Sequence, residues 1–306
     1  MRVLITGGAG FVGSHLTDAL VAEGHDVTII DDLSNGSLDN LSHHGDSIAF
    51  VQQDITLPPA TWFDSDIEKF DVVYNLACWP RSRSFDDPKR DVEVNVIGMV
   101  HAIQLAMEHG SRVVFSSNSG IYDTTNIPIS EATGDDPKTP YDLDKLMAEE
   151  FLKLYGKTFE LDYVIFRFAT VYGPRQRTTE EWKPVVVEFA DKLKKGIPPT
   201  IYWDGNQTRD LIFVKDLVRA LVLALDSDAA RHETMILGSG VETSMNDLFN
   251  LVSEQLRTDI EPQRGEKALG DIARMRYDCA KAERILGWKA STPVSKGVSE
   301  ILDFMS

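Results

Sequence analysis

The chain has 306 residues, of which 42% are hydrophobic and 26% are charged, and its formal net charge is -17. This composition is typical of a soluble globular protein with room for one large or two modest domains, and it excludes the disordered class. Because phosphate backbones are bound by net basic surfaces, we expect no nucleic-acid partner, whereas a local group of arginines could still hold an anionic small molecule.

Targeting and metal-binding patterns are not evident in the sequence. The chain passes from Met1 directly into an apolar segment, and no apolar run reaches the roughly eighteen residues that cross a bilayer. We therefore expect a cytoplasmic protein without a membrane partner. Cys78 and Cys279 lie far apart and lack metal-ligand spacing, so we expect reduced thiols, no disulfide and no metal site.

The first predicted strand, Val3 to Ile5, leads into a glycine turn and then a helix from Phe11 to roughly Glu23. The turn has the spacing Gly8-x-Gly10-x-x-Gly13. A turn of this kind lets backbone N–H groups and the positive end of the helix dipole approach a pyrophosphate. The spacing alone is weak evidence, but its place after a strand and before an acidic residue indicates a dinucleotide-binding turn.

A second apolar strand, Val27 to Ile30, ends in Asp31 and Asp32. A carboxylate about twenty residues after the glycine turn is placed to accept hydrogen bonds from the adenosine ribose. Two acidic groups would repel a 2'-phosphate, and no arginine directly follows this strand, so the sequence favours NAD over NADP. The alternative is that both residues only cap a solvated turn.

The remaining pattern alternates strands with helices. Strands are predicted at 48–51, 72–76, 112–115 and 163–166, and helices near 91–109 and 141–156. Such strands are apolar on both faces, so we expect an α/β fold with a doubly wound parallel sheet of the Rossmann type. From Pro174 onward, glycine and proline punctuate the pattern. We expect a NAD-binding domain at residues 1–172, to which about 212–238 returns, and a smaller α/β substrate domain at 173–306.

Tyr141 and Lys145 are the candidate catalytic pair. Four residues apart on a helix, they share a face, so the ammonium can lower the pKa of the phenol and also hold a ribose hydroxyl. Tyr277 and Lys281 have the same separation, so the spacing alone decides nothing. Tyr141 is preferred because it follows the strand that leads into residues 116–119, whose hydroxyls could face the nicotinamide.

An ordered series of motifs resembles the extended short-chain dehydrogenase/reductase family, in particular its NAD-dependent nucleotide-sugar epimerases and dehydratases of the UDP-glucose 4-epimerase type. The motifs are Thr6-Gly7-Gly8-Ala9-Gly10-Phe11-Val12-Gly13, Asp31-Asp32-Leu33-Ser34-Asn35-Gly36, Asp54-Ile55, Asn75-Leu76-Ala77, Asp87-Pro88, Asn95-Val96-x-Gly98, Ser116-Ser117, Tyr141-x-x-x-Lys145, Val171-Tyr172-Gly173-Pro174-Arg175-Gln176, Gly205-Asn206-Gln207-Thr208-Arg209-Asp210-Leu211 and Lys281-Ala282 with Leu286-Gly287-Trp288. Their shared order and spacing over the whole chain carry the resemblance.

The resemblance implies a bound NAD and a catalytic hydroxyl that contacts the reacting sugar oxygen. The implied cofactor residues are Gly7, Gly10, Phe11, Val12, Gly13, Asp31, Asp32, Ser34, Asn35, Gly36, Asp54, Ile55, Leu76, Ala77, Asn95, Ser116, Tyr141 and Lys145. For the hydroxyl we expect Ser117, with Ser119 as the reserve. Counting back four residues from Tyr122 gives Asn118 instead.

The implied partner is a nucleotide-sugar substrate. The residues expected to contact it are Arg81, Arg83, Ser117, Asn118, Ser119, Tyr141, Thr170, Arg175, Arg209 and Asp271. Arg209 resembles the family's diphosphate contact, whereas Thr170 departs from the usual asparagine. Arg81 and Arg83 could address a sugar carboxylate, which makes a uronic acid substrate an alternative to a hexose. They could equally pair with nearby carboxylates on the surface.

The same segment helps to choose the reaction. Relatives that eliminate water or carbon dioxide carry an added acid just before the tyrosine that matches Tyr122, whereas this chain has Ser119 and Gly120. Epimerisation at C4 needs no second acid or base, so we predict a UDP-hexose or UDP-hexuronate 4-epimerase that oxidises C4, rotates the keto sugar and returns the hydride. The alternatives are a dehydratase, decarboxylase or 4-ketosugar reductase of the same family, and a non-catalytic NAD-binding protein.

The resemblance also implies a homodimer. Relatives commonly pair through a four-helix bundle built from the helices that correspond here to about 91–109 and 141–156. The apolar residues available for it are Val94, Ile97, Val100, Leu146, Phe151 and Leu154, which packing within one chain would explain equally well.

Overall fold

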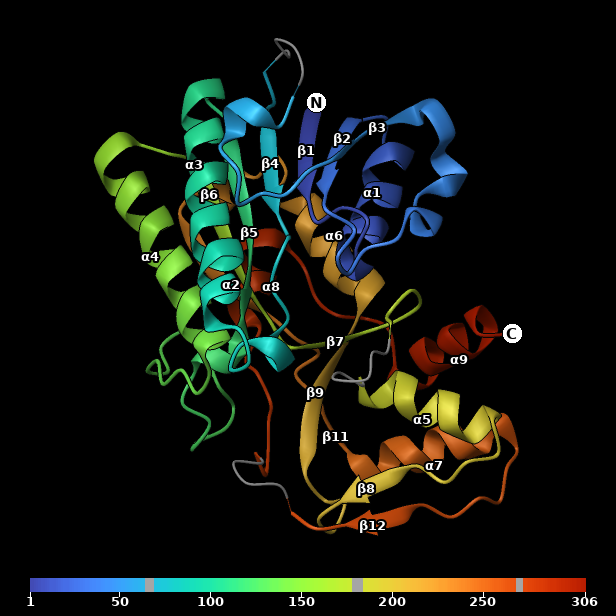
Figure 1. Cartoon of the computed structure of the whole chain (residues 1–306). Helices are drawn as coiled ribbons and strands as arrows, with labels where there is room; N and C mark the ends of the chain where they lie inside the picture. The colour runs from blue at the N-terminus through green and yellow to red at the C-terminus, as the bar shows by residue number, and fades with distance from the viewer. Residues whose placement is uncertain (64–68, 178–183, 268–271) are drawn as a thin grey trace.

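A computed structural model describes residues 1–63, 69–177, 184–267 and 272–306 of the chain. Figure 1 shows a larger part, built on a sheet flanked by helices, and a smaller part that carries α5, α7 and α9. Within the described residues, no helix is both long enough and apolar enough to cross a membrane.

The larger part is built on a parallel sheet of seven strands in the order β10-β6-β5-β4-β1-β2-β3. The order reverses direction between β1 and β4, which is the topological switch point of a doubly wound fold, and the expected fold class is confirmed. The strands are β1 (Arg2–Thr6), β2 (Asp26–Asp31), β3 (Ile48–Gln52), β4 (Val72–Asn75), β5 (Arg112–Asn118), β6 (Tyr163–Phe168) and β10 (Glu233–Leu237).

Helices cover both faces of this sheet. Successive strand residues point to opposite faces, so Val3 and Ile5 enter one hydrophobic core while Leu4 enters the other. The helices of the larger part are α1 (Phe11–Ala22), α6 (Val214–Leu223) and α8 (Ala280–Leu286) on the first core, and α2 (Pro88–Val92), α3 (Gly98–His109) and α4 (Pro140–Phe159) on the second side.

Two element boundaries differ from the sequence expectation. The single helix expected near 91–109 is divided into α2, a π-helical turn η5 (Glu93–Ile97) and α3. The strand expected to end at Phe115 continues as β5 to Asn118, because Ser116, Ser117 and Asn118 pair with β6. The helix α4 begins at Pro140, after a capping box formed by Thr139 and Asp142.

The smaller part contains two short sheets and three helices that pack on one another. Its elements are β7 (Thr170–Tyr172), β9 (Thr208–Phe213) and β11 (Glu242–Ser244) in one sheet, β8 (Thr200–Tyr202) and β12 (Gln263–Gly265) in the other, and α5 (Val185–Lys194), α7 (Met245–Leu256) and α9 (Val294–Phe304). Strand β9 runs directly into α6, which packs against α1. The domain division at residue 172 stays a prediction.

Short 3-10 helices occupy several connections. They are η1 (Leu38–Asn40), η2 (Ser42–Ser47), η3 (Pro59–Thr61), η4 (Arg81–Arg83), η6 (Ser119–Ile121) and η7 (Asp228–Ala230). Of these, η1, η4 and η6 follow the carboxyl ends of β2, β4 and β5, where ligands bind in open α/β sheets.

Candidate active site

A cavity of about 1700 Å³ runs along the carboxyl ends of the strands, between the two parts of the chain. It is larger than the usual pocket of roughly 300–1000 Å³ for one small ligand, so it has room for a dinucleotide and a second molecule. The glycine turn lines one end, Tyr141 lies along its wall, and Arg209 and Met275 line it from the smaller part.

The glycine turn has no space for side chains. Gly7 has a φ of +71°, and a Cβ there would lie 2.7 Å from the backbone of Ala77. A Cβ on Gly13 would lie 2.2 Å from the carbonyl oxygen of Gly7. The following helix has no side-chain cap and no acidic residue in its first turn, which leaves its N–H groups available to an anion. This end of the cavity therefore fits a pyrophosphate.

Asp31 lies at the end of β2 and is 7% exposed. Its Oδ2 accepts from the N–H of Ala9 at 3.0 Å and its Oδ1 from the N–H of Leu33 at 2.8 Å, while burial raises the pKa of the carboxyl. A carboxylate offers about four acceptor positions, so it can also accept from ribose hydroxyls. The residue therefore braces the turn and faces the cavity at once.

Arg90, on α2, also lines this end of the cavity and was not predicted. Its guanidinium lies 2.7 Å from Asp54 Oδ2 and 3.7 Å from Asp32, and it lines the cavity. Hydrogen bonds from Thr56 and Arg90 lower the pKa of Asp54 against the opposing effect of burial. One arginine thus joins two acidic residues that both belong to the predicted adenosine site.

Tyr141 and Lys145 lie on the same face of α4. The Lys145 Nζ donates to the carbonyl oxygen of Ser116 at 2.9 Å and lies 5.6 Å from the centre of the Tyr141 ring. Burial lowers the pKa of Lys145. Burial and the adjacent thiol of Cys78 raise the pKa of Tyr141.

The second Tyr-x-x-x-Lys pair has a different setting. Tyr277 precedes α8 rather than lying within it, and neither it nor Lys281 lines the cavity. The Lys281 Nζ instead contacts Glu233 at 2.8 Å and the carbonyl oxygen of Thr234 at 2.7 Å. The geometry therefore favours Tyr141 and Lys145 as the pair that faces ligands.

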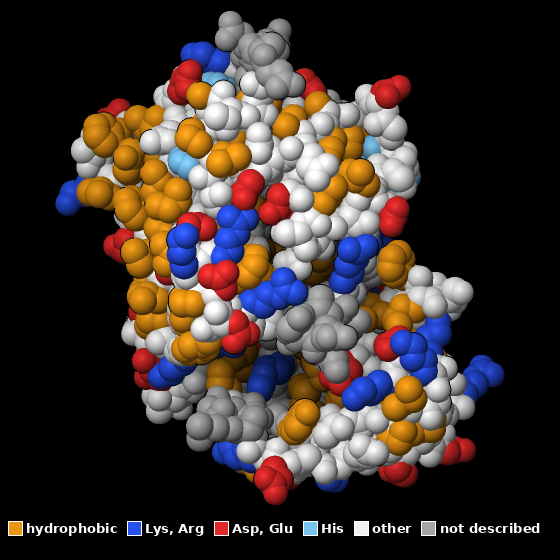
Figure 2. All heavy atoms as spheres, in the orientation of Figure 1, with side chains coloured by type: hydrophobic (Ala, Val, Ile, Leu, Met, Phe, Trp, Pro, Cys, Tyr) orange, Lys and Arg blue, Asp and Glu red, His pale blue; other side chains and the backbone are white. Residues whose placement is uncertain are grey.

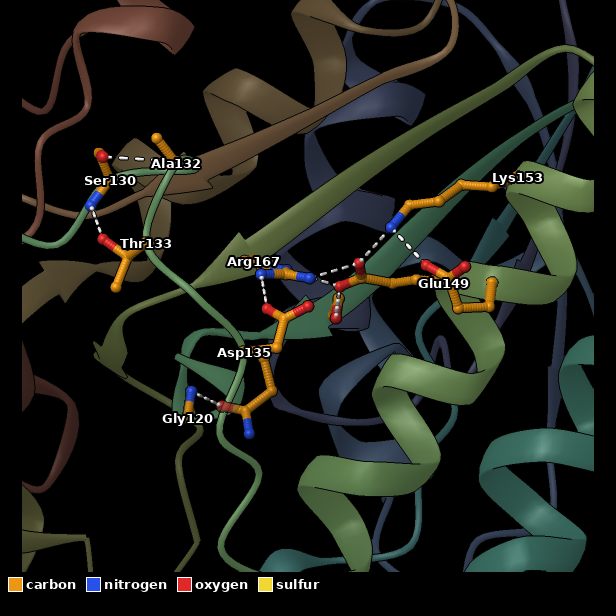
Figure 3. A network of polar contacts seen from close by, with 11 residues as sticks. Gly120, Ser130, Ala132, Thr133, Asp135, Glu149, Lys153 and Arg167 are labelled. Carbon is orange, nitrogen blue, oxygen red and sulfur yellow. Dashed lines mark hydrogen bonds and ion pairs between the residues drawn. The ribbon is translucent and has the colours of Figure 1, made fainter. Parts of the chain in front are cut away.

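Ser117 faces a buried ionic network. Its Oγ donates to Glu149 Oε1 at 2.5 Å, and the same carboxylate accepts two hydrogen bonds of 2.8 Å from Arg167. Figure 3 shows Arg167 between Glu149 and Asp135, with Lys153 also directed at Glu149. The hydroxyl proton of Ser117 is therefore engaged on the side of Glu149, although the residue still lines the cavity.

Asn118 lines the cavity next to Tyr141 and is held from behind. Its Nδ2 donates to Asp142 Oδ1 at 2.5 Å, and its Oδ1 accepts from the N–H of Gly120 at 3.0 Å. Asp142 in turn accepts two hydrogen bonds from Arg81, one from Nε at 3.1 Å and one from Nη2 at 3.0 Å. The asparagine amide thus has a fixed orientation at the end of β5.

Most of the predicted site residues line this cavity. The exceptions among the described residues are Asn95, Ser116 and Lys145, which lie one layer behind its wall: Asn95 bonds Asp91 and the N–H of Trp79, and Ser116 Oγ bonds the carbonyl oxygen of Asn75. Asp271 lies outside the described residues. Trp79, Cys78 and Arg90 line the cavity but were not predicted.

The predicted substrate arginines have protein partners. Arg175 Nη1 lies 2.8 Å from Asp18 Oδ2, and Arg209 Nη1 donates to the carbonyl oxygens of Thr208 and Ile272 at 2.9 Å each. Arg83 lies over the ring of Trp79, 5.7 Å from its centre. Thr170, on β7, lines the cavity with them.

Sequence comparisons show which known proteins this chain is similar to. Residues 3–238 match the sequence model described as the NAD dependent epimerase/dehydratase family. The UDP-glucose 4-epimerase of Mycolicibacterium smegmatis is 36% identical over 310 residues, which cover 99% of this chain and 98% of that protein.

Solved structures agree with the sequence match. The UDP-glucose 4-epimerase of Thermotoga maritima, solved with UDP-glucose, superposes with a TM-score of 0.92 at 30% identity and covers 100% of this chain and 98% of its own. The UDP-glucuronic acid 4-epimerase of Bacillus cereus, solved with UDP-glucuronic acid and NAD, gives a TM-score of 0.90 at 26% identity, with 100% and 99% covered.

Proposed function

Because the chain belongs to the NAD-dependent epimerase/dehydratase family, we propose that it is a UDP-sugar 4-epimerase that keeps its NAD tightly bound. The observation that carries the proposal is the single cavity that joins the glycine turn to Tyr141. In that arrangement, one ligand with a pyrophosphate at Gly7–Gly13 and a second ligand beside Tyr141 meet at the ends of β4 and β5.

The cavity fits NAD without rearrangement of the turn. The steric limits at Gly7 and Gly13 and the uncapped start of α1 suit the pyrophosphate, and Asp31 suits the adenosine ribose. When bound, NAD supplies the hydride acceptor and donor for C4 of the sugar. Lys145 lies behind Tyr141, with its Nζ bonded to the carbonyl oxygen of Ser116, and its role is to stabilise the phenolate of Tyr141.

Tyr141 is the proposed acid and base. In the first half of the reaction its phenolate oxygen takes the proton of the 4-hydroxyl, and in the second half it returns that proton on the other face of the rotated sugar. The positive charge of Lys145 stabilises the phenolate, which burial otherwise disfavours. Asn118 is better placed than Ser117 to donate a hydrogen bond to the sugar oxygen, because the Ser117 hydroxyl is engaged by Glu149.

The lining of the cavity supports epimerisation over elimination. Among the described residues that line it, the carboxylates are Asp31, Asp32, Asp54 and Asp191. Asp31, Asp32 and Asp54 belong to the proposed adenosine end, and Asp191 lies on α5 in the smaller part. Loss of water or carbon dioxide requires a further acid or base beside the sugar, and this lining offers none next to Tyr141.

A neutral hexose is favoured over a hexuronate. Arg81 and Arg83 were the residues predicted to bind a sugar carboxylate, but Asp142 already accepts hydrogen bonds from Nε and Nη2 of Arg81, and Arg83 lies over the ring of Trp79. Asp142 is buried and belongs to the cap of α4, so Arg81 has a fixed protein partner for its charge. Arg209 and Arg175 are proposed for the diphosphate.

A labelling experiment tests the proposal. The purified protein, without added NAD, is incubated in heavy water with UDP-glucose, UDP-galactose, UDP-N-acetylglucosamine or UDP-glucuronate and followed by proton NMR. Conversion of a neutral hexose to its 4-epimer without deuterium incorporation is expected. Deuterium at C5 or C6, or a keto product, would instead establish elimination, and no conversion in the whole panel would favour a non-catalytic NAD-binding protein.

We also propose that the protein is cytoplasmic and forms a homodimer. Figure 2 shows hydrophobic side chains gathered over α3 and α4. Exposed apolar residues of α2, η5, α3 and α4 include Val92, Ile97, Met107, Leu143, Met147, Leu154 and Phe159. A contiguous apolar surface of this kind is typical of a protein interface.

A further inference from the structure

Two buried carboxyl groups lie behind the catalytic pair. Asp91, on α2, is 0% exposed, and Asp144, on the adjacent α4, is 3% exposed. The Oδ2 of each is shielded from solvent and receives no hydrogen bond from the described protein groups. A buried carboxylate oxygen without a donor is unfavourable, so two such oxygens on neighbouring helices need an explanation.

A shared proton explains both oxygens. The two carboxyl groups hydrogen-bond each other, which requires that one of them is protonated. Burial and the neighbouring charge raise the pKa of Asp91 to about 7, and burial raises the pKa of Asp144 to about 6. Near neutral pH the pair therefore holds one proton and one negative charge.

The charge lies beside Lys145. Asp91, Asp144, Glu149 and Cys78 each oppose the effect of burial on the pKa of Lys145. Glu149 is already compensated by Arg167, with Oε2 2.8 Å from Nη2. Among the described carboxylates that face Lys145, the carboxyl pair is thus the one without a cation of its own.

Asp91 is also linked through Asn95 to the loop that follows β4 and lines the cavity. Asp91 Oδ1 accepts from Asn95 Nδ2 at 2.6 Å, and Asn95 Oδ1 accepts from the N–H of Trp79 at 3.2 Å. Asn95 belongs to η5, the π-helical turn that interrupts the helix between α2 and α3. Asp91 therefore connects α4, the irregular turn and the loop after β4.

We propose that Asp91 and Asp144 share one proton and act as positioning residues, whose single negative charge keeps the Lys145 ammonium charged behind Tyr141. The inference rests on the proposed 4-epimerase function, which gives Lys145 its task. Neither carboxyl touches substrate or cofactor; both act through Lys145 and Asn95.

Replacing the two aspartates by asparagine distinguishes an effect of their charge from an effect of their packing. Asp91→Asn and Asp144→Asn each keep one carboxylate and a hydrogen bond between the two side chains, whereas the double variant keeps the shape and loses the charge. At pH 7 we expect each single variant to keep kcat within about threefold of the wild type. In the double variant the rising limb of the pH profile should move to higher pH, because the phenolate of Tyr141 loses the support of a charged Lys145. On that limb kcat should fall at least about tenfold, since a rise of one unit in the pKa of the base lowers its reactive fraction tenfold. A double variant as active as the single variants would overturn the proposal.

A second measurement does not depend on turnover. In protein labelled with ¹³C at the aspartate carboxyl carbons, one resonance should titrate with a midpoint between about 6 and 7. In each single variant the midpoint should change, because the remaining carboxyl no longer faces a second one, although burial still raises its pKa. Full ionisation of both carboxyls by pH 5 would exclude the shared proton even if the enzyme proved active, and a shared proton in an inactive wild type would contradict the proposed function alone. Should the double variant not fold, the single variants and this titration still decide the question.

Discussion

The hydroxyl of Ser117 donates to Glu149 at 2.5 Å and so directs its proton toward the Glu149–Arg167 ion pair rather than toward the cavity. Its neighbour Asn118 is the last residue of the same strand, and its side-chain amide is held by a hydrogen bond to Asp142. Both residues line the cavity, but only the hydroxyl proton of Ser117 is held by the buried ion pair.

Paired alanine substitutions test which residue serves the sugar. Asn118→Ala should lower kcat by about tenfold or more, because a fixed hydrogen-bond donor to the reacting oxygen is lost. Ser117→Ala should change kcat by less than about threefold but lower the free energy of unfolding by about 1 kcal/mol, because Glu149 loses one donor. Steady-state kinetics and urea denaturation give both quantities. The reverse pattern would restore Ser117 as the catalytic hydroxyl.

Tyr141→Phe removes the phenol oxygen and leaves the ring in place. We expect kcat to fall by about 10²–10⁴-fold, the usual contribution of a positioned acid and base, with the bound NAD content unchanged. Tyr277→Phe is the matched control, since it has the same spacing to a lysine but does not line the cavity. Equal losses in the two variants would mean that the assignment of Tyr141 is wrong.

The parallel sheet could be predicted because its strands are short apolar runs bounded by turn residues. The break between α2 and α3 could not, since residues 88–109 read as one helical pattern. The π-helical turn there depends on Asn95 reaching Asp91 and the backbone of Trp79, which are contacts made only in the folded chain.

The site divides in the same way. The glycine turn and the Tyr141–Lys145 pair each lie within one short segment, so their spacing together with the neighbouring predicted strands was the basis for choosing them. Arg90, by contrast, meets Asp54 across 36 residues, and no local pattern marks it. The orientation of Ser117 depends on Glu149, a partner 32 residues away on α4.

Arg90→Ala should weaken NAD binding. The substitution leaves Asp32 and Asp54 without their shared cation at the proposed adenosine end, and we expect a loss of about three- to tenfold in affinity, or roughly 1 kcal/mol. Lys89→Ala is the control, because the Lys89 side chain is 86% exposed and pairs with Glu93 on the surface of the same helical segment. Calorimetric titration of the NAD-depleted protein measures both variants, and equal affinity for the two would exclude a role for Arg90.

The stability of the fold should fall as pH rises toward 8. The pKa of Asp91 is raised from 3.8 to about 7 in the folded chain, so the folded state holds a proton that the unfolded state releases. The corresponding stabilisation is complete below about pH 4 and is lost as pH rises through about 7.

Thermal denaturation between pH 5.5 and 8 measures this effect. Asp144→Asn should flatten the decline in Tm, because Asp91 then faces an amide instead of a second carboxyl group. Asp46→Asn is the control, since Asp46 is exposed, and it should leave the decline unchanged. A wild-type Tm that rises over this interval would contradict the raised pKa.

A charge on the outer face of α4 should separate the proposed dimer. Leu154 is 55% exposed there, and its replacement by Asp would bury a carboxylate in an apolar interface. Leu223→Asp is the control, since Leu223 is 40% exposed on α6, which packs against α1 away from α4. Sedimentation equilibrium at micromolar protein should give a dimer for the wild type and Leu223→Asp and a monomer for Leu154→Asp. A wild type that sediments as a monomer would exclude the homodimer, and a dimer that persists in Leu154→Asp would move the interface elsewhere.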